Sequence, residues 1–229
     1  MMLHTRSARS MVASVLLGAA VGLAQAPASA ATSLSFYDIT HGNAGAEADG
    51  EANLSVEVLD LDGNQVRFKF TNNSSSSLTD VYFDDGTLLG IASISFSSGV
   101  SFSQGATPTN LSGANLTTPA FQVTQGFSAD SNNPVGQNGV SQNEWLAIDF
   151  SLLSGKTFND TLAALMLPNG GGTGDLRIGV RVQNFASGGS GESFISNAIS
   201  PVPEPGSFGM LLGGLGMISM MMLRGKYRQ

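Results

Sequence analysis

The sequence predicts an all-β protein whose body is an antiparallel β-sandwich with a jelly-roll-like arrangement. Three observations favour this class: apolar and polar residues alternate in several short segments, 29 of the 229 residues are glycine, and only 12% are charged. Alternation with a period of two gives a strand one face for a core and one for solvent. A glycine-rich chain with few charges favours turns and strands over long helices.

The clearest strands form a hairpin near the start of the body. Residues 54–58 (Leu-Ser-Val-Glu-Val) and 66–70 (Val-Arg-Phe-Lys-Phe) both alternate, and the connector 60–64 contains an Asp-Gly step. Such steps adopt the positive φ that tight hairpin turns require. We therefore expect two antiparallel strands, with Glu57 facing a basic residue of the second strand on the outer face.

The remaining strands are shorter or less regular, and residues typical of turns bound them. We expect strands at 34–40, 78–83, 88–96, 146–152, 176–185 and 194–198. Residues 97–118 and 130–143 are rich in Ser, Gly, Thr and Asn, which predicts two long loops. Helix is limited to a short segment at 159–165, where Asn159 or Thr157 would cap the first turn.

Residues 1–30 have the organisation of a secretory signal peptide. Basic residues precede an uncharged run at 11–23, and Ala28 and Ala30 supply the small side chains that signal peptidase requires beside its cleavage site. The uncharged run is short for a membrane-spanning helix. We expect cleavage by signal peptidase near Ala30, which leaves residues 31–200 as the exported body.

Residues 201–229 form a second distinctive segment. Val202, Pro203, Glu204 and Pro205 stand at its start, and the 19 residues between Glu204 and Arg224 carry no charge. A helix of that length spans roughly 28 Å at about 1.5 Å per residue, close to the hydrocarbon thickness of a bilayer. The sequence therefore predicts a transmembrane helix over about 208–223.

Three basic residues follow the predicted transmembrane helix: Arg224, Lys226 and Arg228. Positive residues beside a membrane span remain on the cytoplasmic side, and a signal peptide places the preceding chain outside. Both features predict the same orientation. An ordinary single-span membrane anchor behind a proline linker has these features too.

The segment resembles the PEP-CTERM sorting signal of Gram-negative bacteria. Val202-Pro203-Glu204-Pro205, the apolar stretch and the basic end carry this resemblance, which covers the last 29 residues. The same tail is also labelled an ice-binding protein C-terminal domain, a label that implies no antifreeze activity. The resemblance implies that exosortase, an integral-membrane cysteine protease, recognises the Pro-Glu-Pro motif and removes the tail after transient anchoring in the inner membrane. It also implies a cell-surface or matrix protein that accompanies exopolysaccharide and biofilm production.

Composition excludes several classes of function. Residues 31–200 contain 16 acidic and 5 basic residues, so the body would repel a nucleic-acid backbone. The absence of cysteine excludes disulfides, thiol nucleophiles and iron–sulfur clusters. His41 is the one histidine after the signal peptide, and no nucleophile motif accompanies it. We expect no enzymatic activity and no cofactor, but a hydrolase with paired carboxylates stays open because so many acidic residues are present.

Two acidic turns are weak candidates for calcium binding. Asp60 and Asp62 lie in the hairpin connector, and Asp84 and Asp85 precede Gly86. Carboxylate oxygens are the ligands that calcium prefers, but the spacing and the final glutamate of an EF-hand loop are missing. Both segments are therefore predicted to be turns, with calcium as the alternative.

Trp145 is the sole tryptophan and a candidate sugar contact, because aromatic faces stack on pyranose rings. A residue at the rim of the core is the simpler interpretation. Two roles follow for the body, either a structural or adhesive component of an extracellular matrix or a carbohydrate-binding module. A plain membrane-anchored surface protein is the third.

Overall fold

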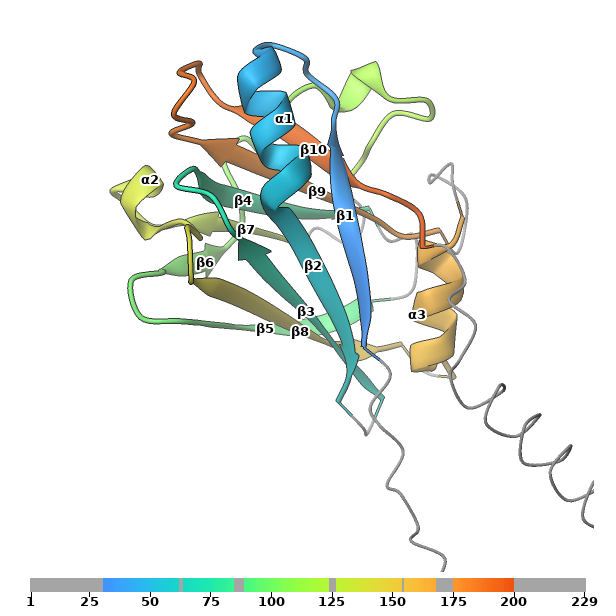
Figure 1. Ribbon diagram of the computed structural model, residues 1–229. Coiled ribbons are helices and arrows are strands. Elements are labelled where there is room, and N and C mark those ends of the chain that lie inside the picture. Colours follow the sequence, from blue (N-terminus) through green and yellow to red (C-terminus); the bar gives the residue numbers. More distant parts are fainter. Residues whose placement is uncertain are drawn as a thin grey trace, which may run out of the picture.

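The computed structural model describes residues 31–61, 64–84, 89–123, 127–153, 155–167 and 175–199. Ten strands lie in this part of the chain: β1 (Thr32–Asp38), β2 (Leu54–Asp60), β3 (Gln65–Asn72), β4 (Ser77–Asp84), β5 (Leu89–Phe96), β6 (Phe102–Gln104), β7 (Ser128–Ser131), β8 (Trp145–Leu152), β9 (Arg177–Gln183) and β10 (Glu192–Ser196). They form one antiparallel sheet in the order β5-β8-β3-β2-β1-β10-β9-β4-β7-β6 (Figure 1).

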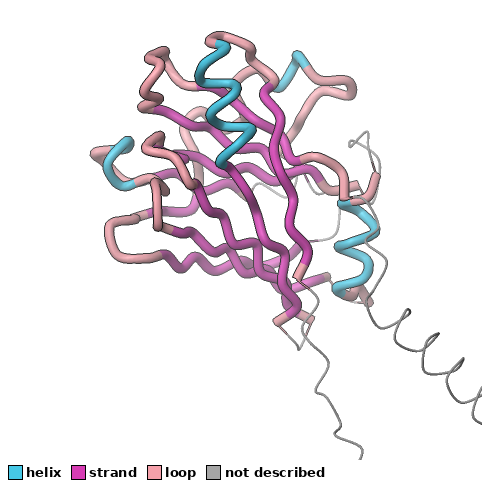
Figure 2. The backbone as a smooth tube through the Cα atoms, in the orientation of Figure 1, coloured by secondary structure: helices cyan, strands magenta, loops and turns pink. Residues whose placement is uncertain are grey.

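Strand β1 belongs to both halves of this sheet. Its residues 32–35 pair with β2, whereas residues 36–38 pair with β10. The sheet curls about β1, so that the half with β2, β3, β8 and β5 faces the half with β10, β9, β4, β7 and β6 (Figure 2). The predicted antiparallel all-β class is confirmed. The expected two sheets of a sandwich are replaced by one curled sheet, because β1 hydrogen-bonds to both halves.

Phenylalanine rings fill the space between the two halves. Phe83 of β4 packs against Phe68 of β3 and Phe150 of β8, with ring centroids 5.1 and 4.8 Å apart. Phe127, just before β7, packs edge-on against Phe150 at 4.8 Å. These edge-to-face contacts are favourable ring geometries and join strands from opposite halves in one core.

The predicted hairpin is confirmed in its register. Strands β2 and β3 pair along their length, and Glu57 lies opposite Lys69 on the outer face. The other predicted strands are present as β1, β4, β5, β8, β9 and β10, with ends that differ by a few residues. Strand ends depend on hydrogen-bond partners from elsewhere in the sheet, and local alternation does not reveal these partners.

Helix α3 (Phe158–Leu165) confirms the predicted short helix. Thr157 caps it, because its hydroxyl accepts the Asp160 N–H while the Asp160 carboxylate accepts the Thr157 N–H. The expectation that helix would be limited to this segment is wrong. Helix α1 (Ala44–Asn53) precedes β2, and Asn43 caps its start by accepting the N–H groups of Gly45 and Ala46.

The two predicted long loops contain regular structure. Strand β6 and the 3₁₀ helix η1 (Ala114–Leu116) lie within 97–118, and helix α2 (Val135–Asn138) lies within 130–143. Strand β7 overlaps the start of the second segment. Strand β7 pairs with β4, and β6 pairs with β7, so both extend the edge of the second half. Because backbone hydrogen bonds make this pairing, mainly polar sequences can form these strands.

The predicted signal peptide at 1–30 and the sorting segment at 201–229 lie outside the described residues. Within the described ranges, no helix is long and apolar enough to cross a membrane.

Candidate functional site

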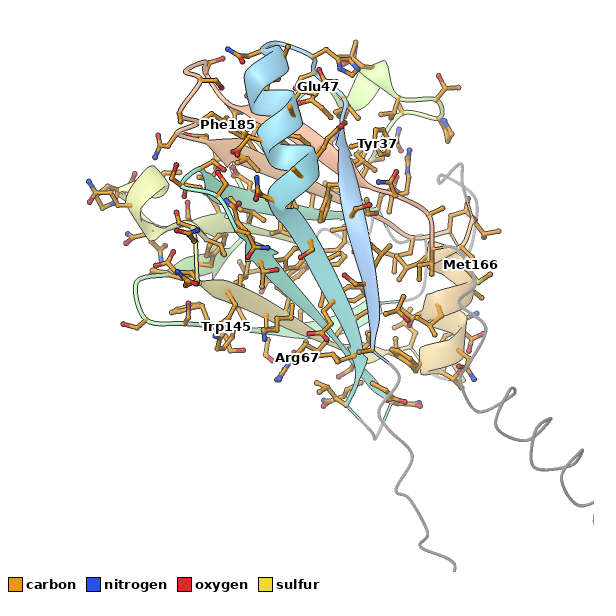
Figure 3. The ribbon with its side chains drawn as sticks, in the orientation of Figure 1. Tyr37, Glu47, Arg67, Trp145, Met166 and Phe185 are labelled. Atoms are coloured by element: carbon orange, nitrogen blue, oxygen red, sulfur yellow. The ribbon has the colours of Figure 1, made fainter. Side chains whose placement is uncertain are left out.

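The outer face of the first half of the sheet carries Trp145. This residue begins β8 and lies opposite Thr71 of β3, while its neighbour Leu146 is buried in the core. Its ring is therefore directed outward and is half-buried (Figure 3). This orientation follows from strand alternation, because Trp145 is adjacent to the buried Leu146 in β8.

Small hydroxyl groups extend from Trp145 across the strands. The cross-strand row Ser35, Ser55, Thr71 and Trp145 follows from the register, and the Ser55 and Thr71 hydroxyls are 2.8 Å apart. Ser33, Ser93 and Ser95 lie on the same outer face by register. We call this surface, with its charged residues, the Trp145 face.

Charged side chains flank Trp145 on the same face. Lys69 Nζ lies 5.9 Å from the centre of the Trp145 ring, within reach of a cation–π contact. Arg67 pairs with Asp149 across the strands, through Nε to Oδ1 at 2.7 Å and Nη2 to Oδ2 at 2.8 Å. This bidentate pair raises the pKa of Arg67 through its hydrogen bond to Asp149. The face thus combines one aromatic ring, hydroxyls and fixed charges.

The acidic turns differ in what the structure describes. Asp60 ends β2 in an exposed position, and Asp62 and Asp85 lie outside the described residues. Asp84 is buried, and its Oδ2 accepts Arg177 Nη2 at 2.5 Å and the Gln122 N–H at 3.2 Å. Its charge is therefore compensated by a cation within the protein. No three His, Asp or Glu side chains in the described ranges converge to hold a metal ion.

His41 lies at the surface near the start of α1. Its Nδ1 is 3.3 Å from Glu47 Oε2, and this hydrogen bond is the main cause of the raised His41 pKa. Its backbone N–H donates to Asp38 Oδ1 at 2.6 Å. Acidic side chains thus surround His41. Within the described residues, no nucleophilic side chain forms a hydrogen bond with its ring.

The body ends beside α3. The Ile199 N–H donates to the Leu165 carbonyl at 3.1 Å, and its partly buried side chain packs against the core. Two residues earlier, Asn197 is tied to Ser35 through its backbone N–H at 2.9 Å and through its side-chain amide at 2.9 Å. The last described residues therefore follow a fixed path along the body.

A groove of about 860 Å³ runs beside this path. Leu116, Leu165, Leu167 and Leu176 contribute apolar lining, and residues 196–198 form part of its wall. Tyr37, His41 and Glu51 contribute polar lining. No local sequence pattern indicates this groove, because its residues come from β1, α1, η1, the end of α3 and β10.

Comparison with protein families finds the PEP-CTERM protein-sorting motif at residues 201–228. The match includes the Pro-Glu-Pro sequence at 203–205 and confirms the resemblance on which the sequence analysis relied. No curated protein and no solved structure matches the chain. The motif indicates processing by exosortase during export and a destination at the cell surface or outside the cell. The chain therefore carries the PEP-CTERM protein-sorting motif, which marks a protein that exosortase sorts to the cell surface or beyond.

Proposed function

We propose that the β body is a structural or adhesive component of an exopolysaccharide or biofilm matrix. The observation that carries this proposal is the sorting motif, which begins at residue 201, two positions after the last described residue. A body with an extensive hydrophobic core and an excess of acidic residues supports the proposal, because such a fold remains soluble outside the cell.

In this proposal the residues with assigned roles lie in the sorting segment. Pro203, Glu204 and Pro205 form the region that exosortase recognises, and residues 208–223 anchor the chain transiently in the inner membrane. Arg224, Lys226 and Arg228 fix the orientation. Signal peptidase removes the segment that ends at Ala28-Ser29-Ala30.

The intact mass of the protein from its native host tests this pathway. We expect the form in the medium to lack residues 1–30 and the tail after the Pro-Glu-Pro region. Glu204→Ala should retain the tail and stay in the membrane fraction. Glu57→Ala, which removes an acidic residue from the body surface, should be released normally. A wild-type mass that retains residues 224–229 would identify a plain membrane-anchored protein instead.

A matrix role also requires a phenotype. Deletion of the gene should weaken the matrix, and the processed protein should fractionate with extracellular polysaccharide. Complementation by wild type but not by Glu204→Ala would link matrix strength to sorting. An unchanged matrix in the deletion strain would contradict the structural role and leave export unaffected.

A carbohydrate-binding module is the second candidate function. The half-buried Trp145 ring beside hydroxyl groups and the Arg67–Asp149 pair favours it, because sugars bind through ring stacking and polar hydrogen bonds. As the sole tryptophan, Trp145 reports on its own surroundings. Its fluorescence should change on titration with host exopolysaccharide, and Trp145→Ala should abolish retention in polysaccharide affinity gels. Tyr37→Ala should be retained, because this exposed aromatic lies in the part of β1 that pairs with β10 and not with β2.

We also propose that the body acts without catalysis and without a bound metal. The compensation of Asp84 by Arg177 supports this for one of the two acidic turns. A calcium titration should leave the melting temperature of wild type and of Asp62→Ala unchanged. A calcium-dependent rise in wild type that Asp62→Ala removes would instead establish the turn at 60–64 as a calcium site.

A further inference from the structure

The distance between the folded body and the sorting motif is short, and this bears on how exosortase meets its substrate. Ile199 is fixed to Leu165 by a hydrogen bond and packs against the core, so the last described residue has a defined place on the body. Four residues lead from Ile199 to Pro203, and a fully extended chain covers about 14 Å over that distance. A body of this length has a radius of gyration of about 15 Å.

An enzyme that holds Pro203 therefore lies against the body. Residues 200–203, the tether between the body and the motif, reach no farther than the radius of the body. The position of Ile199 on the body therefore determines which end of the body faces the enzyme. That end carries the C-terminal residues of α3, and Leu165 and Leu167 there line the groove. It is the part of the body that lies nearest to any partner of the sorting motif.

Apolar side chains are exposed at this end. Met166 and Leu167, which follow α3, are 40% and 46% exposed, and Met166 lies on the side of α3 that faces away from the sheet (Figure 3). Leu167 lines the groove together with Leu165 and Leu176. Apolar residues gathered at the rim of a concave surface are typical of an interaction site.

We propose that exosortase docks on this end of the folded body, with an apolar segment of its extracytoplasmic surface in the groove beside Leu167. This inference rests on the proposed sorting function and adds the body as a second recognition element. A protein partner is favoured over a lipid surface, because the site is concave and the acidic body is repelled by anionic lipids.

The first test measures the rate of processing in the native host by pulse-chase. Leu167→Lys and Leu167→Glu should each slow release by about fivefold or more, as loss of an apolar anchor does at protein interfaces. Phe96→Lys is the matched control. Phe96 is similarly exposed, at 39%, but it ends β5 opposite the start of β8, away from α3. Melting temperatures of all variants establish that each body folds.

The sign of the charge introduced at position 167 distinguishes a lipid partner from a protein partner. If the groove end contacts anionic lipid, Leu167→Lys should be processed as fast as wild type or faster, and only Leu167→Glu should be slow. That outcome would overturn the proposed contact with exosortase. Equal processing of wild type and both variants would overturn docking altogether.

A spacer tests whether the short tether enforces the contact. About twelve Gly and Ser residues inserted between Ile199 and Ser200 add roughly 20 Å of reach. In this background Leu167→Lys should be processed at the same rate as its own wild-type parent. A fivefold difference that persists with the spacer would show that Leu167 acts by some route other than the tethered contact.

Glu204→Ala separates this inference from the sorting function. If Glu204→Ala is released normally, the proposed sorting itself fails. If Glu204→Ala is blocked while both Leu167 variants are processed normally, sorting stands and only the docking proposal fails.

Discussion

Among single residues, Asp80 is a buried carboxyl group whose pKa is raised well above its ordinary value. It is 3% exposed and lies between Asp130 of β7 and Arg181 of β9, with the Thr79 hydroxyl bonded to its Oδ2 at 2.8 Å. Burial is the main cause that raises the pKa of Asp80 to about 6. The neighbouring Asp130 raises it further, whereas the Thr79 bond and Arg181 lower it.

This shift predicts a pH-dependent stability. The stabilising effect of protonated Asp80 is complete below its ordinary pKa of 3.8 and is lost as the pH rises through about 6. The difference amounts to about 3 kcal/mol at most. Asp80→Asn should therefore melt at a higher temperature than wild type at pH 8 and lose the gain at pH 4. Parallel melting profiles for the two proteins between pH 4 and 8 would refute this cause.

Arg177 provides a second prediction for a single residue. Its guanidinium compensates buried Asp84, donates to the Pro119 and Ala120 carbonyls, and lies 5.3 Å from the Phe121 ring. Arg177→Met should lower the free energy of unfolding by about 3–5 kcal/mol, because it leaves a buried carboxylate without a cation. Urea denaturation measures the change. Asp84→Asn in the same chain should recover part of it, and strictly additive losses would exclude the pair as the cause.

The sequence could identify Asp84 as an acidic residue near a turn, but not its partner. Arg177 stands 93 positions away, and no local pattern connects the two. Trp145 was different, because alternation with the apolar set at 146–152 already directed it outward. Local geometry is predictable from a single sequence, whereas compensation of a buried charge by a distant residue is not.

At the scale of the elements, α1 and α3 differ in how well the sequence predicts them. Thr157 and Asp160 form a capping box before α3, and apolar residues recur on its buried face. The only apolar residues of α1 are alanines, and it contains two glycines besides. It therefore lacks the spaced large side chains that indicate an amphipathic helix. Its position depends on packing against β1 and β10, which the sequence does not reveal.

Gly50 explains why α1 tolerates a glycine in its interior. A Cβ at this position would collide with the ring of Phe194 from β10, so the helix lies directly on that ring. Gly→Ala stabilises most helix interiors by about 0.5–1 kcal/mol. Here Gly50→Ala should instead lower the melting temperature, whereas Gly50→Ala combined with Phe194→Leu should recover part of the loss. A higher melting temperature in the single variant would contradict this packing.

At the scale of the molecule, the two halves of the sheet should unfold together. Phe83 of the second half contacts Phe68, Phe70 and Phe150 of the first. Phe83→Ala should destabilise the protein by about 3–5 kcal/mol, the usual cost of emptying such a site. Trp145 fluorescence reports on the first half, and hydrogen exchange of β9 reports on the second. Both should shift by the same free energy, and separate transitions would show independent halves.

The curl of the sheet could not be predicted, although most of its strands could. Alternation identifies a strand and its buried face but says nothing of which distant strand it pairs with. The decisive pairing joins residues 36–38 of β1 to residues 194–196 of β10, across nearly the whole body. The same limitation applies to the groove, whose walls come from elements at both ends of the described chain.

The shared strand β1 also sets the order of events during export. The hairpin of β2 and β3 can form as soon as it crosses the membrane, because its contacts are local. The curl cannot close until β10 arrives, since residues 36–38 have no other partner in the sheet on that side. Only the short stretch from Ser196 to residue 201 then separates the last strand from the sorting motif. In the proposed export, the fold is therefore completed at nearly the same moment as the sorting motif emerges.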